Sequence, residues 1–338
     1  MMPKLLLQAA AAAAVADRRW YGSGGRRGYL PLRHPPHVAP GRFTACLLAV
    51  AAVTTTFALA LTLHRPDLSA ASPRGVGGGG GAGYAVVINT WKRYDLLRRS
   101  VAHYSGCGGA GAVHVVWSEP EEPTEELRGS VLNCSGGGAG VRFVINAEDS
   151  LNNRFRPIQG LTTDAVFSVD DDLIVPCSTL RFAFAVWQSA PSTMVGFVPR
   201  MHWLADPGSN AKEYRYGSWW SVWWTGTYSM VLSKASFFHR KYLDLYTNHM
   251  LPSIRDYVNE NRNCEDIAMS FLVANVTGSP PIWVQGRIFE IGSSGISSLK
   301  GHDLQRSKCL NTFSAMYGHM PLVATTVKAV DSRTSWFW

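Results

Sequence analysis

The sequence predicts an α/β fold with a mostly parallel central sheet and helices on both of its faces. From residue 84 onward, runs of β-branched residues alternate with helical patterns, which is typical of repeated strand–helix–strand units. The chain has 338 residues, of which 46% are hydrophobic, enough to bury the core of one large domain. In such a sheet, ligands bind in the crevice beside the carboxyl ends of the strands.

β-Branched and aromatic residues predict five strands in the first part of this domain. The strands span residues 84–90, 112–118, 141–146, 164–172 and 193–200. Apolar residues at helical spacing predict helices over residues 91–104 and 178–191. The second of these begins on a serine cap and ends at a proline.

The pattern changes after residue 200. Residues 213–232 are rich in aromatic side chains and predict strands, whereas residues 233–247 return to helical spacing. A further helix is predicted over residues 263–276, with two acidic side chains in its first turn, where the helix dipole favours them. At least two tryptophans of the aromatic run are expected in the core, although exposed rings would suit a sugar or the edge of a lipid headgroup site. These tryptophans are Trp219, Trp220, Trp223 and Trp224.

The net charge of +8 belongs to the N-terminal region and not to the predicted domain. Residues 1–66 contain eight basic residues against Asp17 alone, so residues 67–338 carry about one net positive charge. The domain therefore lacks the broad positive surface of nucleic-acid-binding proteins, and no nucleic-acid partner is expected.

An uncharged apolar run of 21 residues, residues 43–63, is long enough to cross a bilayer as one helix. Basic residues precede it, so the positive-inside bias predicts that residues 1–42 are a cytosolic tail and residues 43–63 a transmembrane signal anchor. Residues 64–83 then form a flexible glycine-rich stem and residues 84–338 a lumenal domain. A secretory signal or an organelle transit peptide is the alternative explanation of this N-terminal region.

Sequons and cysteines agree with passage through the secretory pathway. N-glycosylation sequons begin at Asn133 and Asn275. Cys46 lies in the predicted span, and the remaining five cysteines are an odd number, so at least one is unpaired or pairs between chains. Together these features predict a single-pass type II protein of the Golgi membrane.

Three consecutive carboxylates, Asp170, Asp171 and Asp172, directly follow the fourth predicted strand. Like charges at this spacing raise one another's pKa unless a cation compensates them. Mn²⁺, or alternatively Mg²⁺, accepts carboxylate oxygens as ligands. The chain has no glycine-rich P-loop, so the carboxylates suit a metal-bridged nucleotide diphosphate that departs as a leaving group. A metal-dependent phosphohydrolase or nucleotidyltransferase is an alternative that also uses clustered aspartates.

From Tyr84 to its C-terminus the chain resembles the glycosyltransferase domain of the exostosin-like family, family 64 of retaining glycosyltransferases. Eight motifs in the same order carry the resemblance: NTWKRYDLL, NNRF, TDAVFSVDDD, FAFAVWQSAP, MVGFVPR, YSMVLSKASFF, NCEDIAMSFL and QRSKCLN. The resemblance implies a GT-A fold, in which an aspartate-rich turn holds Mn²⁺ against the diphosphate of a sugar nucleotide.

The resemblance also implies a role for each matching residue. Asp266 matches the proposed catalytic acid and Asp172 the direct metal ligand, with Asp170 beside the metal. Cys264 and Cys309 match a disulfide of the family. The residues that match contacts to the nucleotide sugar are Asn89, Arg93, Ser118, Asn153, Arg154, Asp170, Asp171, Glu265 and Arg306. Ser118 stands where the family often has an amide side chain.

The aromatic run and the C-terminal end resemble the plant branch of the family, whose members transfer mannose from GDP-mannose to glycosylinositol phosphorylceramide, a Golgi sphingolipid. This resemblance implies a GDP-mannose donor and a glycolipid acceptor. Animal relatives use UDP-N-acetylhexosamines, so a transferase that uses UDP-GlcNAc or UDP-GalNAc on a glycan or glycolipid is the alternative. A non-catalytic sugar-binding or adhesion protein is a further alternative from another class.

Overall fold

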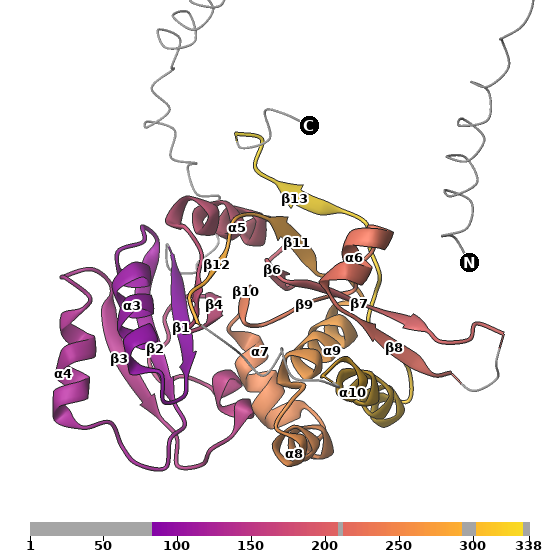
Figure 1. The fold of residues 1–338 in the computed structure, drawn as a ribbon, viewed down its shortest axis with the longest axis horizontal. Coiled ribbons are helices and arrows are strands. Elements are labelled where there is room, and N and C mark those ends of the chain that lie inside the picture. The colour runs from indigo at the N-terminus through magenta and orange to yellow at the C-terminus, as the bar shows by residue number, and fades with distance from the viewer. Residues whose placement is uncertain (1–82, 209–211, 293–301, 334–338) are drawn as a thin grey trace, which may run out of the picture. The chain divides into compact units, whose positions relative to one another are not determined.

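The structure is a computed structural model that describes residues 83–208, 212–292 and 302–333, all of which belong to one compact unit (Figure 1). The predicted tail, the predicted membrane span and nearly all of the predicted stem lie outside the described residues. Within the described ranges, no helix is long and apolar enough to cross a membrane.

A mostly parallel eight-stranded sheet forms the centre of the fold, as predicted. Its order is β13-β11-β6-β10-β4-β1-β2-β3, and in this sheet only β10 runs antiparallel to its neighbours. The strands are β1 (Tyr84–Thr90), β2 (Ala110–Trp117), β3 (Gly140–Ile145), β4 (Ala165–Asp170), β6 (Val195–Gly196), β10 (Ala235–His239), β11 (Ile282–Gln285) and β13 (Lys328–Val330). Two smaller sheets pair β5 (Leu173–Ile174) with β12 (Phe289–Glu290), and β7 (Pro199–Leu204) with both β8 (Tyr214–Gly217) and β9 (Met230–Val231).

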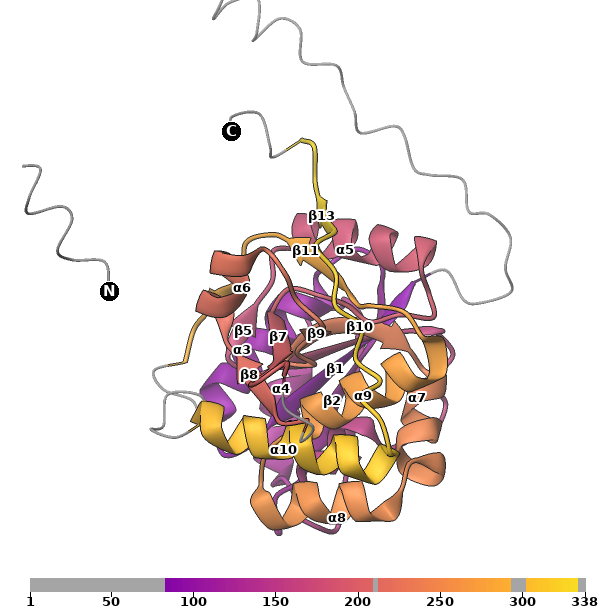
Figure 2. The same ribbon diagram turned by 90° about the vertical axis from the view of Figure 1, so that its right-hand side faces the viewer.

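Helices cover both faces of the central sheet, and in Figures 1 and 2 α8, α9 and α10 gather on the same side. The α-helices are α3 (Tyr94–Ser105), α4 (Glu125–Asn133), α5 (Cys177–Ser189), α6 (Trp219–Thr225), α7 (Lys241–Asp244), α8 (Pro252–Asn261), α9 (Glu265–Thr277) and α10 (His302–Tyr317). A 3₁₀-helix, η2 (Leu151–Phe155), and a π-helical turn, η3 (Leu245–His249), complete the helical elements of the described chain.

Alternation along the central strands divides the core into two hydrophobic clusters, one on each face of the sheet. In β4, Phe167 packs in the cluster that includes Val101 of α3, whereas its neighbour Val166 packs in the cluster that includes Phe313 of α10. Because both faces are covered, β4 is buried from Ala165 to Val169, and all of these residues except Ser168 are apolar. The sheet therefore holds the end of β4 rigidly.

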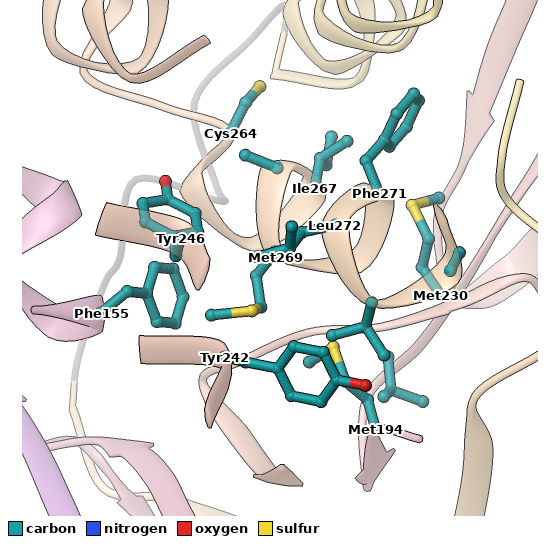
Figure 3. Packing of buried hydrophobic residues seen from close by; sticks show 14 of the residues in the cluster. Phe155, Met194, Met230, Tyr242, Tyr246, Cys264, Ile267, Met269, Phe271 and Leu272 are labelled. Atoms are coloured by element: carbon teal, nitrogen blue, oxygen red, sulfur yellow. The ribbon is translucent and has the colours of Figure 1, made fainter. Parts of the chain in front are cut away.

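The helix α9 is surrounded by the core. All ten residues from Glu265 to Ala274 are buried, and between Ile267 and Ala274 the only polar side chain is that of Ser270. Figure 3 shows Met269, Phe271 and Leu272 of α9 among side chains from several other elements, including Tyr246 and Met230. A helix packed in this way fixes the position of its own N-terminus.

The predicted helix over 91–104 and the predicted helix over 263–276 are confirmed, with α3 starting three residues later than expected. The predicted strand over 193–200 is instead two short strands that belong to different sheets. The predicted serine cap of α5 is wrong, because the N-cap is Pro176 and no side chain caps this helix.

Two predictions in the aromatic region are wrong. Residues 219–225 form the helix α6 and not a strand, because buried Val222 anchors the helix and Gly226, with φ of 66°, ends it in the left-handed region. Aromatic residues favour strands, which explains the error. Residues 235–239 form the central strand β10, where burial on both faces conceals the alternation that marks a strand. The helical pattern of this segment is realised only from Lys241 onward.

Candidate active site

An open cleft of about 710 Å³ lies at the carboxyl ends of β1 and β4. Residues from both halves of the domain line it, and most of them are polar. They include Asn89, Arg93, Ser118, Arg154, Asp170, Asp172, Arg200, Tyr216, Ser218, Lys234, Glu265, Asp266, Gly292 and Arg306. The cleft therefore brings together most of the residues that the sequence predicts to contact a nucleotide sugar.

The three aspartates leave β4 at a fixed place in the sheet. Asp170 pairs with Asn89 of the parallel strand β1, and its backbone N–H donates to the carbonyl of Lys234 at 3.1 Å. The N–H of Asp171 donates to the carbonyl of Asn89, also at 3.1 Å. Because the strands on both sides of β4 hold this turn, its carboxylates have defined directions.

Asp171 points away from the cleft. Its side chain is fully buried, it accepts a hydrogen bond from Thr90 Oγ1 at 2.7 Å, and it lies 2.5 Å from Nη2 of Arg93. Burial raises its pKa to about 6, although Thr90 and Arg93 act in the opposite direction. Asp171 was predicted to contact the nucleotide, but the structure places it beneath the cleft, where it orients Arg93.

Asp170 and Asp172 are partly exposed to the cleft, and each pairs with one arginine. Oδ1 of Asp170 lies 2.5 Å from Nη2 of Arg154, and Oδ2 of Asp172 accepts a hydrogen bond from Nη1 of Arg93 at 2.7 Å. Two carboxylates that open into one cleft offer the hard oxygen ligands that Mn²⁺ and Mg²⁺ prefer.

Gly292 leaves space for Asp172. A Cβ atom at Gly292 would lie 2.9 Å from the Cβ of Asp172 and 3.2 Å from its Oδ2. The contact is held in place because the N–H of Ile291 donates to the carbonyl of Asp172 at 2.7 Å. Any larger residue at this position would displace the carboxylate that we predict to bind the metal.

Arg154 joins the aspartate turn to α9. Its guanidinium is almost fully buried, donates to Ser233 Oγ at 3.1 Å and lies 3.8 Å from Oε1 of Glu265. A buried cation requires such partners. The motif NNRF thus places Arg154 in the cleft, as predicted.

The start of α9 holds two buried carboxylates whose pKa values move in opposite directions. Burial and the neighbouring Asp266 raise the pKa of Glu265 to about 7, against the effects of Arg154 and Arg306. Burial also acts to raise the pKa of Asp266, but the Arg306 guanidinium outweighs it, with help from Arg154, and the pKa lies below its usual value. Asp266 is therefore the ionised member of the pair at neutral pH.

Arg306 of α10 orients Asp266. Nη2 of Arg306 donates to Oδ2 of Asp266 at 2.9 Å, and Nη1 donates to the hydroxyl of Tyr216 at 3.2 Å. The guanidinium also lies 5.3 Å from the centre of the Tyr216 ring. Sequence reasoning missed Tyr216, because nothing in the aromatic run distinguishes it from its neighbours.

Asn89 and Ser118 line the cleft, and Asn153 lies behind Ser118. Asn153 is buried, and its Nδ2 donates to Ser118 Oγ at 2.9 Å and to the carbonyl of Glu148 at 2.6 Å. Asn153 is not among the residues that line the cleft, and its predicted contact to the nucleotide stays a prediction. Sequence reasoning also missed Arg200 of β7 and Lys234, which directly precedes β10, and both of these line the cleft.

The described residues form two disulfides. The bond between Cys264 and Cys309 that the resemblance implied is present and joins the start of α9 to α10. The second bond joins Cys107 to Cys177, a pairing that the sequence left open. Among the described cysteines, Cys134 is outside a disulfide.

The side chains of the two sequon asparagines, Asn133 at the end of α4 and Asn275 in the last turns of α9, are both exposed. Their glycosylation stays a prediction.

The fold and the cleft define a transferase of sugar nucleotides once the chain is compared with known proteins. The glycosyl transferase family 64 domain matches residues 84–336. The chain belongs to this family and is a glycosyltransferase. The two other classes considered from the sequence, a phosphohydrolase or nucleotidyltransferase and a non-catalytic sugar-binding protein, are therefore wrong.

Individual relatives agree with the family. The chain is 60% identical over 262 residues to glycosylinositol phosphorylceramide mannosyl transferase 1 of Arabidopsis thaliana. The matched region covers 76% of this chain and 78% of that protein. It is 36% identical over 258 residues to exostosin-2 of Mus musculus, with 74% of this chain covered but only 34% of exostosin-2. It is 37% identical over 214 residues to exostosin-1 of Drosophila melanogaster, over 61% of this chain and 27% of that protein. The chain thus spans about a third or less of the exostosins.

Proposed function

We propose that this glycosyltransferase transfers mannose from GDP-mannose, with retention of configuration, to the headgroup of a glycosylinositol phosphorylceramide. The observation that carries the proposal is the 60% identity to a plant mannosyl transferase named for this lipid, spread over 78% of that relative. The mixed α/β sheet, with carboxylates and arginines at its carboxyl edge, fits a GT-A-like fold.

We propose Mn²⁺ as the cofactor, with Mg²⁺ as the alternative. Asp170 and Asp172 would hold the ion, because both carboxylates open into the cleft and Gly292 leaves room beside Asp172. The bound ion would neutralise the diphosphate of the donor as it departs. Asp170, Asp171 and Asp172 follow one another at this edge of the sheet, and a bound cation would offset the repulsion among them.

Asp266 would act on the sugar. Retention places the new bond on the face that the diphosphate left, through a transition state with positive charge at the anomeric carbon. Arg306 keeps Asp266 ionised, and the packed helix α9 holds it at the cleft, so its negative charge can stabilise that transition state. The buried guanidinium of Arg154 would stabilise the leaving diphosphate.

A transferase that uses UDP-GlcNAc or UDP-GalNAc is the second candidate. It is favoured only by the exostosins, which are 36 to 37% identical to this chain. The higher identity to the mannosyl transferase favours GDP-mannose.

We further propose a type II topology in the Golgi membrane with the catalytic domain in the lumen. Two disulfides among the described residues suit an oxidising compartment, and both sequon asparagines are exposed. The predicted span over residues 43–63 supplies the anchor.

The test is a thermal-shift series on the full chain in detergent with Mn²⁺ and each of three donors: GDP-mannose, UDP-GlcNAc and UDP-GalNAc. A ligand that binds only the native state must raise the melting temperature, so GDP-mannose alone should do so, and only with the metal present. Transfer to the glycolipid, with the anomeric configuration of the product determined by NMR, then tests the reaction. A shift with UDP sugars and none with GDP-mannose would establish the second candidate instead.

A further inference from the structure

The helix α6 exposes all four of its tryptophans. The exposed fractions of Trp219, Trp220, Trp223 and Trp224 are 42%, 72%, 61% and 82%, so the expectation that at least two of them pack in the core is wrong. We call these four side chains the tryptophan face. Folded domains rarely leave so many large apolar side chains in one place unless the surface binds something.

The spacing of these tryptophans puts them on one side of the helix. Positions i, i+1, i+4 and i+5 span about 140° of the circumference at 100° per residue. Val222 lies on the opposite side and is buried. No residue of α6 is charged, and the indoles contact one another, with ring centres of Trp220 and Trp223 at 5.9 Å.

The helix that carries the tryptophan face begins next to a residue of the cleft. Ser218, which precedes α6, and Tyr216, which contacts Arg306, both line the cleft. Figures 1 and 2 show α6 beside β7, at the side of the domain away from α4. A substrate that reaches the cleft from this side would pass the tryptophans.

The aromatic surface continues to a cation. Trp219 packs edge-on against Trp283 of β11 at 5.6 Å, and Nζ of Lys328 in β13 lies 5.1 Å from the centre of the Trp283 ring. Val327, next to Lys328, is 72% exposed. An uncharged aromatic surface with a cation at its edge matches the interface of a bilayer, where apolar chains meet phosphate groups.

We propose that the tryptophan face docks on the surface of a lipid bilayer and so presents the cleft to acceptor headgroups in the same membrane. The inference rests on the glycolipid acceptor proposed above. Indole rings prefer the headgroup region because each has an apolar body and one N–H donor.

The predicted anchor permits this contact. Twenty residues, 64–83, separate the predicted span from the domain, and a flexible stem of this length extends on average about 25 Å. The radius of gyration of a domain of this size is about 18 Å, so the stem holds the domain close to the membrane without fixing which face it presents. The tryptophan face would select that orientation.

The experiment uses the full chain in phosphatidylcholine vesicles whose acyl chains carry bromine, which quenches nearby tryptophan fluorescence. The triple variant Trp220→Ser, Trp223→Ser and Trp224→Ser is compared with Leu132→Ser, which changes an exposed apolar residue of α4. The predicted span contains no tryptophan, so it adds no background. We expect the triple variant to lose most of the quenching and the control to keep it. Equal quenching of wild type and triple variant would overturn the proposal.

Activity separates the docking surface from the proposed function. We expect the triple variant to raise the KM for bilayer glycolipid by at least about tenfold, with transfer from GDP-mannose to the soluble headgroup unchanged. If wild type transfers to neither acceptor while the quenching difference persists, the proposed function fails and the docking surface stands. If transfer to both acceptors is the same in wild type and triple variant, the docking surface fails and the proposed function stands.

Two other occupants of the tryptophan face would also overturn the proposal. If the triple variant turns a dimer into a monomer in detergent without changing the quenching, the face binds a second copy of the chain. If quenching appears only after deletion of residues 334–338, the C-terminal segment of the chain covers the face.

Discussion

The two halves of the domain build their parts of the cleft in different ways. The N-terminal half, residues 84–172, pairs four parallel strands, and its cleft residues lie at strand ends, just after them or in the short helix η2. The C-terminal half, residues 199–317, brings Asp266 of α9 against Arg306 of α10, forty residues later in the chain, and Arg306 also contacts Tyr216 of β8.

The difference concerns burial as much as topology. Asp170 and Asp172 of the first half are open to the cleft, as a donor or metal site must be. Glu265 and Asp266 of the second half are buried among the arginines. We infer that the first half binds the donor and the second half carries out the transfer, and the following predictions test this division.

The two disulfides give the largest expected difference. Cys107→Ser with Cys177→Ser, or Cys264→Ser with Cys309→Ser, opens a loop of 70 or 45 residues, and either pair should lower the free energy of unfolding by about 4 kcal/mol. Only the second pair should also reduce transfer, because Cys264 directly precedes the acidic turn of α9. Denaturant titration and transfer assays measure the two effects, with Cys134→Ser as a control that changes neither. Full transfer by the second pair would contradict the division.

Single carboxylates give the next largest effect. Asp266→Asn should lower transfer by a hundredfold or more, about 3 kcal/mol, while the thermal shift with Mn²⁺ and GDP-mannose remains. Asp172→Asn should abolish that metal-dependent shift. If Asp266→Asn turns over at a near-normal rate, Asp266 has no part in the reaction.

The dependence of stability on pH should have opposite signs in the two halves. In the folded protein, Glu265 has a pKa of about 7, compared with its usual value of 4.5. Between these two pH values the folded state therefore keeps a proton on Glu265 that the unfolded state has released. Wild type should therefore lose stability relative to Glu265→Gln as the pH rises from about 4.5 to 7, by about 1 to 3 kcal/mol.

His114 of β2 provides the contrast. Burial, and then Arg142, lower its pKa to about 4, so only the unfolded state takes up a proton between pH 6.5 and 4. Wild type should lose about 1 to 3 kcal/mol of stability relative to His114→Asn as the pH falls through that range. Urea midpoints across pH 4 to 7.5 measure both slopes, and two slopes of the same sign would show that one of the groups is not buried as described.

The smallest expected effect comes from one methyl group. Gly292→Ala would push against Asp172, so the affinity for Mn²⁺ should fall roughly tenfold with little change in stability. Gly129→Ala adds the same methyl to α4, where no atom lies within 4 Å of the new Cβ, and should leave metal affinity unchanged. Calorimetric titration with Mn²⁺ compares the two variants. Equal affinities would show that the metal does not bind beside Asp172.

The same division explains what the sequence could predict. Strand β1 has the predicted bounds, and β2, β3 and β4 agree within two residues, because their runs are short and rich in β-branched residues. The motifs also brought Arg154, Asp266 and Arg306 to notice before the structure showed them around one cleft.

Other features depend on contacts that no local pattern records. Asp171 was grouped with its neighbours, yet the hydrogen bond from Thr90 turns it beneath the cleft. Tyr216 and Gly292 matter only through partners distant in the chain. The helix α6 was predicted as a strand because tryptophan favours strands.

The sequence alone determined the alternating α/β plan, the acidic turn and the family, because these depend on residues that are close together along the chain. The tertiary structure decided which carboxylates face the cleft, which of them stay ionised and which tryptophans meet solvent. Burial and long-range pairing set these properties, since both depend on segments that approach one another only after the sheet and its helices have packed.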